Sequence, residues 1–244
     1  MKILGNTKKI HFIGIGGIGM SGMAEFLKNH DFIITGSDIS KSDRIKHLLN
    51  IGIKINIEHN KNNIKGCDLI VYSSAVPKDN PEILEGRKNK IPVIKRAELL
   101  GELIKIKEVS IAVAGTHGKT TTSSMIGNIL HEAKLDPTII TGGIINKFNS
   151  NNITGSGNII VVEADEFDKS FLSLNPTYST INNIELEHLD IYKDINDLKE
   201  TFITYANSTP FYGTVAVCND CDYTRQIIKN INRNVVTFGI DKKS

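Results

Sequence analysis

Short apolar segments alternate with amphipathic segments along the whole chain. In the first hundred residues the apolar runs predict strands at 10–13, 32–34, 53–57, 68–72 and 91–94. Helical spacing of apolar residues and N-cap signals predict helices at 20–28 and 42–49, from Pro81, and at 97–104. Strands and helices in alternation are typical of a parallel sheet with helices on both faces.

A second cycle begins at Glu108, after the charged segment 105–108. Its expected strands lie at 109–114, 138–140, 158–162, 178–182, 215–218 and 235–238. Its expected helices lie at 120–133, 196–207 and 220–231, and an Asn-, Gly- and Ser-rich loop is expected at 146–158. We therefore expect two domains, residues 1–107 and 108–244. The second is expected to be truncated on its C-terminal side, because the chain stops soon after a strand.

Composition excludes several classes of protein. The 244 residues include 29 basic and 27 acidic side chains, so the net charge of +2 favours neither nucleic acid nor a membrane surface as a partner. No apolar run approaches the ~18 residues needed to span a bilayer. Three cysteines form no disulfide framework, and the lone pair Cys218 and Cys221 is best explained as incidental spacing. These features predict a cytoplasmic protein.

The first glycine cluster predicts a site for a diphosphate. Gly14-Ile15-Gly16-Gly17-Ile18-Gly19 fits G-x-G-x-x-G between a strand and a helix. Gly14 permits the turn, Gly16 lets the backbone approach the diphosphate, and Gly19 lets the helix pack closely. Asp38, at the end of the second strand, is placed to accept hydrogen bonds from a ribose. The motif alone does not show whether its ligand is NAD, FAD or a nucleotide sugar.

A second loop predicts an ATP or GTP site. It lies between a strand and a helix and consists of Gly115, Thr116, His117, Gly118, Lys119, Thr120 and Thr121. We expect its backbone N–H groups to bind the phosphates, Lys119 to bridge the β- and γ-phosphates, and the Thr120 hydroxyl to bind Mg²⁺. Glu163 ends an apolar run and is a candidate metal carboxylate. From spacing alone, His188 is more often structural than a metal ligand.

Motifs in both halves resemble the Mur ligase family. The resemblance extends over the whole chain and is carried by His11–Gly22, Gly36–Asp38, Ser73–Val76, Arg96–Glu98, the loop with His117, Glu163–Glu166, Asn183–Tyr192 and Pro210–Gly213. It implies a Rossmann-like parallel-sheet domain that binds a UDP-sugar, followed by an incomplete P-loop-type α/β domain that binds ATP.

The resemblance also implies the chemistry and further site residues. The expected activity is ATP-dependent ligation of L-alanine to UDP-N-acetylmuramate through an acyl phosphate, in peptidoglycan precursor synthesis. Gly14, Gly16, Gly17 and Gly19 would bind the UDP-sugar diphosphate, with Asp38, Ser73 and Ser74 near its ribose and uracil. Thr120, Glu163 and His188 would hold Mg²⁺, and Lys119 and His188 would be catalytic. The amino-acid-binding domain is expected to be missing from this chain, and a C-terminal fragment supplied in trans is one of the ways in which the enzyme could be completed.

Three alternatives stay open at this stage. A related ligase that reattaches a recycled tripeptide to the same UDP-sugar has a similar phosphate loop. A non-catalytic nucleotide-sugar-binding fragment would keep both loops without chemistry. An NAD-dependent oxidoreductase would use the first loop but has no use for Lys119 and Thr120.

Overall fold

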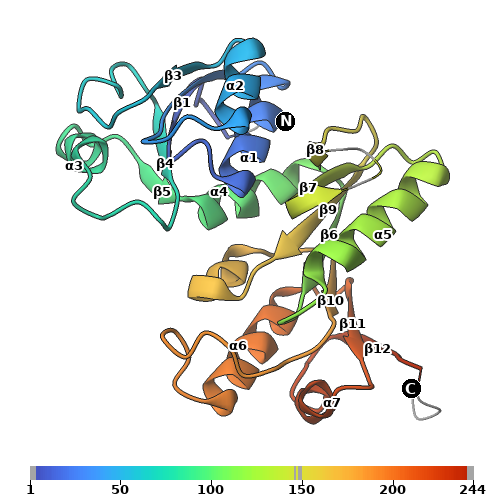
Figure 1. The fold of residues 1–244 in the computed structure, drawn as a ribbon. Coiled ribbons are helices and arrows are strands. Elements are labelled where there is room, and N and C mark those ends of the chain that lie inside the picture. Colours follow the sequence, from blue (N-terminus) through green and yellow to red (C-terminus); the bar gives the residue numbers. More distant parts are fainter. Residues whose placement is uncertain (1–3, 146, 148–149, 241–244) are drawn as a thin grey trace. The chain divides into compact units, whose positions relative to one another are not determined.

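A computed structural model describes residues 4–145, 147 and 150–240 (Figure 1). The chain divides into two compact units, one ending at Glu102 and the other beginning at Leu103. This division lies close to the charged segment 105–108. No helix in the described ranges is both long and apolar enough to cross a membrane.

The first unit is a five-stranded parallel sheet with the order β3-β2-β1-β4-β5. Its strands are β1 (Lys9–Ile13), β2 (Ile33–Ser37), β3 (Lys54–Asn56), β4 (Leu69–Tyr72) and β5 (Val93–Lys95). Its helices are α1 (Ile18–Lys28), α2 (Asp43–Asn50), α3 (Pro81–Lys88) and α4 (Arg96–Leu103). After β1 the chain builds one side of the sheet and then returns to the other side at β4. Ligands of open α/β sheets bind beyond the carboxyl ends of the strands at such a reversal.

Local signals and burial explain the helices of this unit. The Ser42 hydroxyl accepts a hydrogen bond from the Ile45 N–H at 3.3 Å and so caps α2, as expected. The Asn80 side chain caps α3 in the same way through the Glu82 N–H, and Pro81 occupies its first turn. The buried apolar face of α1, which includes Met20, Met23 and Leu27, lies in the core.

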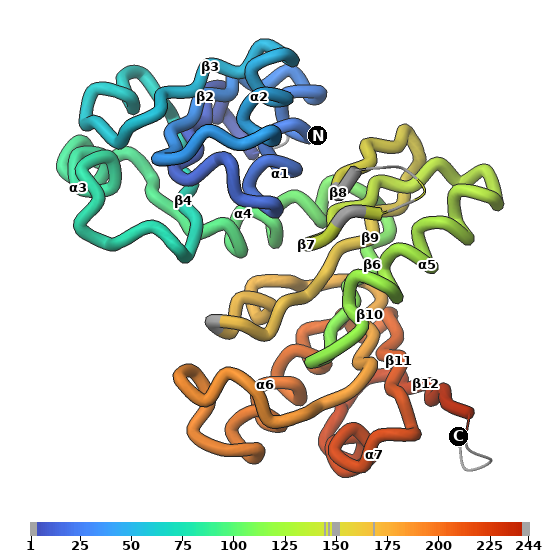
Figure 2. Tube along the Cα trace, viewed as in Figure 1, coloured from blue at the N-terminus to red at the C-terminus, as the bar shows by residue number. Residues whose placement is uncertain are grey.

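The described residues of the second unit form a seven-stranded sheet with the order β12-β11-β10-β6-β9-β7-β8 (Figure 2). Its strands are β6 (Val109–Ala114), β7 (Thr138–Ile145), β8 (Ser150–Ile153), β9 (Ile159–Ala164), β10 (Tyr178–Ile181), β11 (Thr214–Cys218) and β12 (Asn234–Phe238). Its helices are α5 (Lys119–Glu132), α6 (Ile195–Ser208) and α7 (Asp222–Ile228), with 3-10 turns η1 (Ile104–Ile106) and η2 (Phe167–Ser173). All pairings are parallel except that of β8 with β7.

The expectation of an irregular loop at 146–158 was wrong in part, because β8 lies within it. This strand pairs antiparallel with β7, with Ile153 opposite Ile139 and Asn152 opposite Ile140. Its sequence, SNNI, has no alternation of apolar and polar residues. Pairing with a neighbour distant along the chain therefore decides its conformation, and local propensity does not.

An aromatic cluster supports the strand that leads into the phosphate loop. The Phe171 ring stacks on Tyr205 with centroids 4.8 Å apart and meets Phe202 edge-on at 5.2 Å. The buried Tyr205 hydroxyl donates a hydrogen bond to the Ala112 carbonyl oxygen at 2.9 Å. Burial raises the pKa of Tyr205, so the phenol keeps this proton. The contact anchors α6 to β6 just before the loop begins.

Tyr205→Phe should lower the free energy of unfolding by about 1 kcal/mol, because it removes a buried hydrogen bond and keeps the ring. Chemical denaturation monitored by circular dichroism measures this difference. Tyr212→Phe is the matched control, since Tyr212 is 69% exposed. Equal stabilities for the two variants would contradict the assigned role of the hydroxyl.

Candidate functional site

The glycine loop of the first unit directly follows β1, and its shape requires the absence of side chains. Gly14 has φ of +76°, and a Cβ there would lie 3.2 Å from Val76 Cγ2 and 3.3 Å from Ser73 Cβ. A Cβ at Gly16 would lie 2.9 Å from the Asp38 carboxylate. The helix α1 then begins after Gly17 with no side-chain cap. This is the arrangement that backbone binding of a diphosphate requires.

Asp38 holds the glycine loop through its carboxylate. It is 8% exposed, and its Oδ2 accepts a hydrogen bond from the Gly16 N–H at 2.8 Å. Its Oδ1 accepts from the N–H and the hydroxyl of Ser40, both at 3.0 Å. Both oxygens of the Asp38 carboxylate, which was predicted to bind a ribose, thus already accept hydrogen bonds from the chain. Each carboxylate oxygen can still accept a further hydrogen bond, so a ribose contact remains a prediction.

A cavity of about 590 Å³ adjoins this loop. It is lined by Gly14, Gly17, Asp38, Ile39, His59, Ser73, Ala75, Val76, Pro77, Asp79, Asn80 and Pro81. Ser73 therefore lies in the cavity wall, whereas Ser74 is exposed and does not line it. Apolar walls with a few polar groups are typical of a small-molecule site.

A buried polar network beside this cavity was not predicted from the sequence. The Glu82 carboxylate is fully buried and accepts hydrogen bonds at one oxygen from the Ser37 hydroxyl at 2.5 Å and from His11 at 3.4 Å. Its other oxygen accepts from the Asn63 side chain at 2.6 Å and from the Asn60 N–H at 3.1 Å. A histidine within the apolar run 10–13 was the one sequence signal that pointed to such a network.

Hydrogen bonds lower the pKa of the Glu82 carboxyl by more than burial raises it. Burial is the largest single effect and acts to raise the pKa of the carboxyl. Hydrogen bonds from His11, Ser37 and Asn63, with the charge of His11, together hold the pKa below its usual value of 4.5. Glu82 is therefore a buried anion that depends on its donors.

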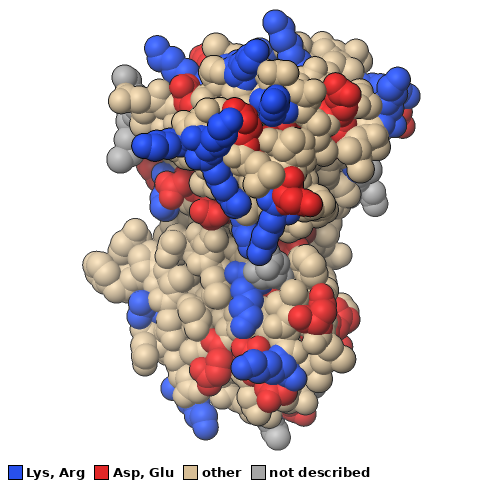
Figure 3. All heavy atoms as spheres, turned by 90° about the vertical axis from the view of Figure 1, so that its left-hand side faces the viewer, with Lys and Arg blue, Asp and Glu red and all other residues tan. Residues whose placement is uncertain are grey.

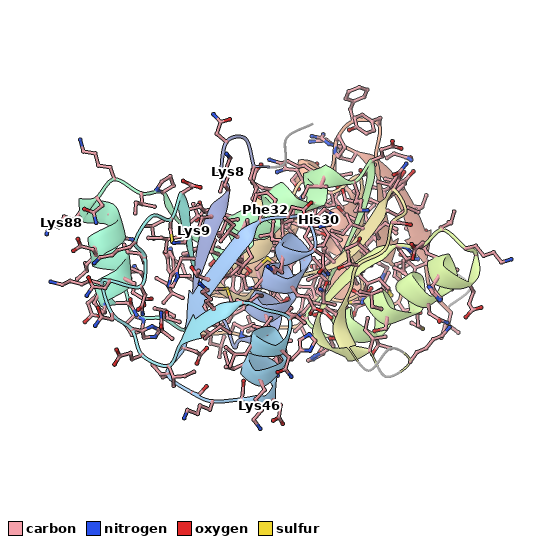
Figure 4. The ribbon with its side chains drawn as sticks, turned by 90° about the horizontal axis from the view of Figure 1, so that it is seen from above. Lys8, Lys9, His30, Phe32, Lys46 and Lys88 are labelled. Carbon is pink, nitrogen blue, oxygen red and sulfur yellow. The ribbon has the colours of Figure 1, made fainter. Side chains whose placement is uncertain are left out.

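Two exposed lysines of the first unit, by contrast, do not line the cavity. Lys46 and Lys88 project outward from α2 and α3 (Figure 4), and each pairs with a carboxylate on its own helix. Basic and acidic side chains both occur on the visible face of each unit (Figure 3). A bound phosphate would thus be held by local groups rather than by a broad field.

The phosphate loop of the second unit follows β6 and is fixed by the segment after β10. Gly115 has φ of +140°, and a Cβ there would lie 3.0 Å from Asn182 Cβ. The Asn183 side chain accepts from the His117 N–H at 2.8 Å and donates to the His117 carbonyl at 3.1 Å. The Thr116 N–H donates to the Asn183 carbonyl at 3.2 Å. Asn183 therefore positions the loop, a role that the sequence did not reveal.

Lys119 begins α5 and is held by oxygen atoms. Its ammonium donates to the Gly115 carbonyl at 2.8 Å and to Glu166 Oε2 at 2.7 Å. Glu166 is 1% exposed, and its Oε1 has no hydrogen-bond partner among the described residues. Burial raises the pKa of Glu166, and Lys119 acts against this effect. No motif in the sequence predicted this contact of Glu166.

Thr120 and Glu163 lie together, and their chemistry fits Mg²⁺. Burial raises the pKa of the Glu163 carboxyl, and the nearby Thr120 hydroxyl acts against this effect. Glu163 Oε1 is buried without a hydrogen-bond partner in the described part of the chain. A carboxylate and a hydroxyl supply hard oxygen ligands, and Mg²⁺ takes few protein ligands beside water and phosphate. The orphaned oxygen is where a cation would compensate the buried charge.

His188 lies beside Glu166 and not in an assembled metal cluster. Its Nε2 is 3.7 Å from Glu166 Oε1, and its ring meets Phe167 edge-on at 5.3 Å. Its backbone has φ of +56°. Within the described ranges, no group of three or more His, Cys, Asp or Glu side chains is arranged to hold a metal. The metal role of His188 stays a prediction.

His117 and Thr121 occupy the exposed side of the phosphate loop. His117 Nε2 lies 3.4 Å from Glu185 and 3.3 Å from Glu187, and all three side chains are largely exposed. Thr121 is exposed in the first turn of α5. These contacts are open to solvent, so they contribute little to stability.

Comparison with known sequence families decides the relationship. The model described as "Mur ligase family, catalytic domain" matches residues 9–108, and the "Mur ligase middle domain" matches residues 113–244. The chain belongs to the Mur ligase family. The family explains why one chain carries two phosphate-type loops on separate sheets.

Individual relatives are similar over nearly the whole chain. A UDP-N-acetylmuramate–L-alanine ligase of Persephonella marina is 50% identical over 98% of this chain, which covers 52% of that protein. The structure of UDP-N-acetylmuramate–alanine ligase MurC from Thermotoga maritima matches with a TM-score of 0.83 and 32% identity, over 96% of this chain and 53% of that one. The chain spans about half the length of the curated relatives it matches.

A ligase whose name specifies a peptide instead of L-alanine also matches in structure. UDP-N-acetylmuramate:L-alanyl-gamma-D-glutamyl-meso-diaminopimelate ligase from Neisseria meningitides aligns with a TM-score of 0.87 and 25% identity. The match covers 95% of this chain and 78% of that chain. The fold of this Mur ligase is thus shared by relatives whose names specify different amines.

Glu82→Gln should destabilise the protein at pH 7 by about 1–3 kcal/mol, because it removes the charge that the buried donors stabilise. The folded pKa lies below 4.5, so this stability is present above pH 4.5 and is lost as pH falls through the folded pKa. Urea unfolding measures the free energy of unfolding of both proteins from pH 7 to pH 3.5. The difference in this free energy between wild type and variant should become smaller as the pH falls.

Glu85→Gln is the control, since Glu85 lies on the same helix and pairs only with exposed partners. A difference for Glu82→Gln that stays constant across this pH range would show that the carboxylate charge is not what stabilises the network.

Proposed function

We propose that this chain supplies the UDP-sugar and ATP sites of an enzyme that ligates L-alanine to UDP-N-acetylmuramate in the cytoplasm, during peptidoglycan precursor synthesis. The observation that carries the proposal is the phosphate loop, in which Lys119 pairs with the buried Glu166 and lies near the half-buried Glu163. The 50% identity to an L-alanine ligase supports this choice of amine.

The cavity beside Gly14 and Gly16 supports binding of the UDP-sugar. The loop offers backbone to a diphosphate, and apolar walls such as Val76 and Pro77 offer a surface for a base. Asp38 keeps the loop in place and offers its remaining acceptor capacity to a ribose. Ser73 borders the same space. Ser74 lies outside it, so we assign it no contact.

The second unit supports binding of ATP with Mg²⁺. Gly115–Thr121 would surround the phosphates, and the Lys119 ammonium would exchange Glu166 for phosphate oxygens. Thr120 and Glu163 would hold the metal, with His188 nearby as its further candidate ligand. When bound, Mg²⁺ neutralises negative charge on the phosphates.

The proposed reaction has two steps. The lactyl carboxylate of the sugar attacks the γ-phosphorus of ATP, and ADP leaves with the electrons of the broken bond. The amine of L-alanine then attacks the acyl phosphate, and inorganic phosphate leaves as the amide forms. Lys119 assists the first step by stabilising charge on the transferred group. Residues outside these 244, in the same chain or supplied in trans, would hold the amine.

The recycling ligase is the second candidate, favoured by the TM-score of 0.87 to the Neisseria structure. Both candidates share the nucleotide sites, so only the amine separates them. Product formation with L-alanine or with the tripeptide, measured on the full-length enzyme, decides between them. A non-catalytic binding role would leave neither amine consumed.

The chain should bind UDP-N-acetylmuramate and not NAD in calorimetry. Gly16→Val should abolish binding, because the side chain would occupy the space where the diphosphate approaches and press on Asp38. Leu84→Val, on the exposed side of α3, is the control. Preference for NAD over the UDP-sugar would overturn the assignment.

ATP binding should require Mg²⁺ and should depend on Lys119. Lys119→Ala is expected to weaken it at least tenfold, because a charge-assisted contact to phosphate is lost. Lys229→Ala, on the exposed end of α7, should bind like the wild type. Calorimetry with and without Mg²⁺ measures all three proteins, and an unchanged affinity for Lys119→Ala would show that this loop does not bind ATP.

A further inference from the structure

A tight turn in the second unit carries His188 to Glu166. His188 has φ of +56°, in the left-handed region that a residue other than glycine rarely adopts. Its carbonyl oxygen accepts hydrogen bonds from the N–H groups of Ile191 at 2.8 Å and Tyr192 at 3.0 Å, which close the turn. A strained backbone conformation persists only where its surroundings hold it. We therefore expect contacts outside the turn to fix it.

Tyr192 ties the far end of this turn to the same residue that the imidazole meets. Tyr192 is 1% exposed, and its hydroxyl donates a hydrogen bond to the Glu166 carbonyl oxygen at 2.6 Å. At the near end of the turn, His188 Nε2 lies 3.7 Å from Glu166 Oε1. The turn therefore contacts Glu166 twice, at its backbone and at its carboxylate. The place of the imidazole beside that carboxylate depends on how firmly the backbone contact holds.

A second set of contacts fixes the Tyr192 ring and the Glu166 backbone. Lys169 Nζ lies 5.2 Å from the centroid of the Tyr192 ring and 3.0 Å from a carboxylate oxygen of Asp197, in the first turn of α6. The Lys169 N–H donates to the Glu166 carbonyl oxygen at 3.0 Å, so this oxygen accepts two hydrogen bonds. At its other end Glu166 accepts from Lys119. A continuous set of contacts thus joins Tyr192 to the phosphate loop.

We propose that Tyr192 is a positioning residue for the Mg²⁺ site, and that its hydroxyl keeps the His188 imidazole in place by anchoring the turn to the Glu166 backbone. The inference rests on the proposed binding of ATP with Mg²⁺ and adds a residue that acts through His188. Groups that orient metal ligands from behind change metal affinity by about tenfold or more when they are removed. Tyr192→Phe removes the hydroxyl and keeps the buried ring, so it separates the anchor from the packing.

The first test needs neither metal nor nucleotide. The His188 ring meets Phe167 edge-on with ring centroids 5.3 Å apart, so the ring current of Phe167 displaces the NMR shifts of the imidazole protons. In Tyr192→Phe these shifts should move toward those of an exposed histidine such as His47. Tyr205→Phe loses a buried hydrogen bond of the same kind, to a strand carbonyl, and should leave the His188 shifts in place. Unchanged His188 shifts in Tyr192→Phe would contradict the anchor.

The second test measures the Mg²⁺ concentration at which ATP binding is half-maximal in calorimetry. Tyr192→Phe should raise this concentration about tenfold. His188→Ala should raise it as well, and the double variant should need no more Mg²⁺ than His188→Ala alone. The two effects should not add, because Tyr192 acts through His188. If Tyr192→Phe raises the Mg²⁺ requirement by the same factor with and without the imidazole, the two residues act independently and the inference is wrong.

The outcomes separate this inference from the proposed function. A wild-type chain that binds no ATP in the presence of Mg²⁺ overturns the proposed ATP site and with it the role of Tyr192. Mg²⁺-dependent ATP binding with the same Mg²⁺ requirement in wild type and Tyr192→Phe overturns the role of Tyr192 alone. If Tyr192→Phe does not fold, the hydroxyl proton of Tyr192 in the wild type decides. Slow exchange of this proton with water supports the buried hydrogen bond, and rapid exchange contradicts it.

Discussion

Parallel strand pairing brings the carboxyl ends of neighbouring strands to one edge of each sheet, and the candidate sites lie on those edges. In the first unit Gly14 follows β1 and Ser73 follows β4. In the second unit Gly115 follows β6, Glu163 lies near the end of β9, and Asn182 follows β10. Residues far apart in the chain meet there because the strands that carry them are paired. The topology therefore decides which side chains can act together.

Both sites hold their charged groups in place without a ligand. Lys119 is paired with Glu166, and Asp38 is bound by the N–H of Gly16. Glu82 receives donors at both oxygens. Side chains fixed in this way lose little freedom when a ligand binds, which favours affinity. Binding at the second site would still cost free energy, because a Lys119 ammonium that moved to a phosphate would leave the buried Glu166 without its cation.

Much of the fold and of the loops could be predicted because their determinants are local. Strand, glycine turn and helix follow one another within a few residues at Gly14 and at Gly115, and the caps at Ser42 and Asn80 are formed by neighbouring residues. The roles of Asn183, Glu166 and Glu82 could not be predicted, because each acts on a partner brought near by strand order. β8 was missed for the same reason, since its pairing with β7 and not its sequence makes it a strand.

The glycine motif illustrates what a local pattern leaves undecided. An acid after the second strand is commonly assigned to a ribose, yet here Asp38 accepts hydrogen bonds from Gly16 and Ser40, so its first task is to shape the loop. A loop shaped for a diphosphate accepts any nucleotide that carries one. Selection among nucleotides must then come from groups farther along the cavity. His59, which follows β3 and lies 3.0 Å from the Ser37 hydroxyl, lines the cavity beyond the loop, so strand order decides which side chains border that space.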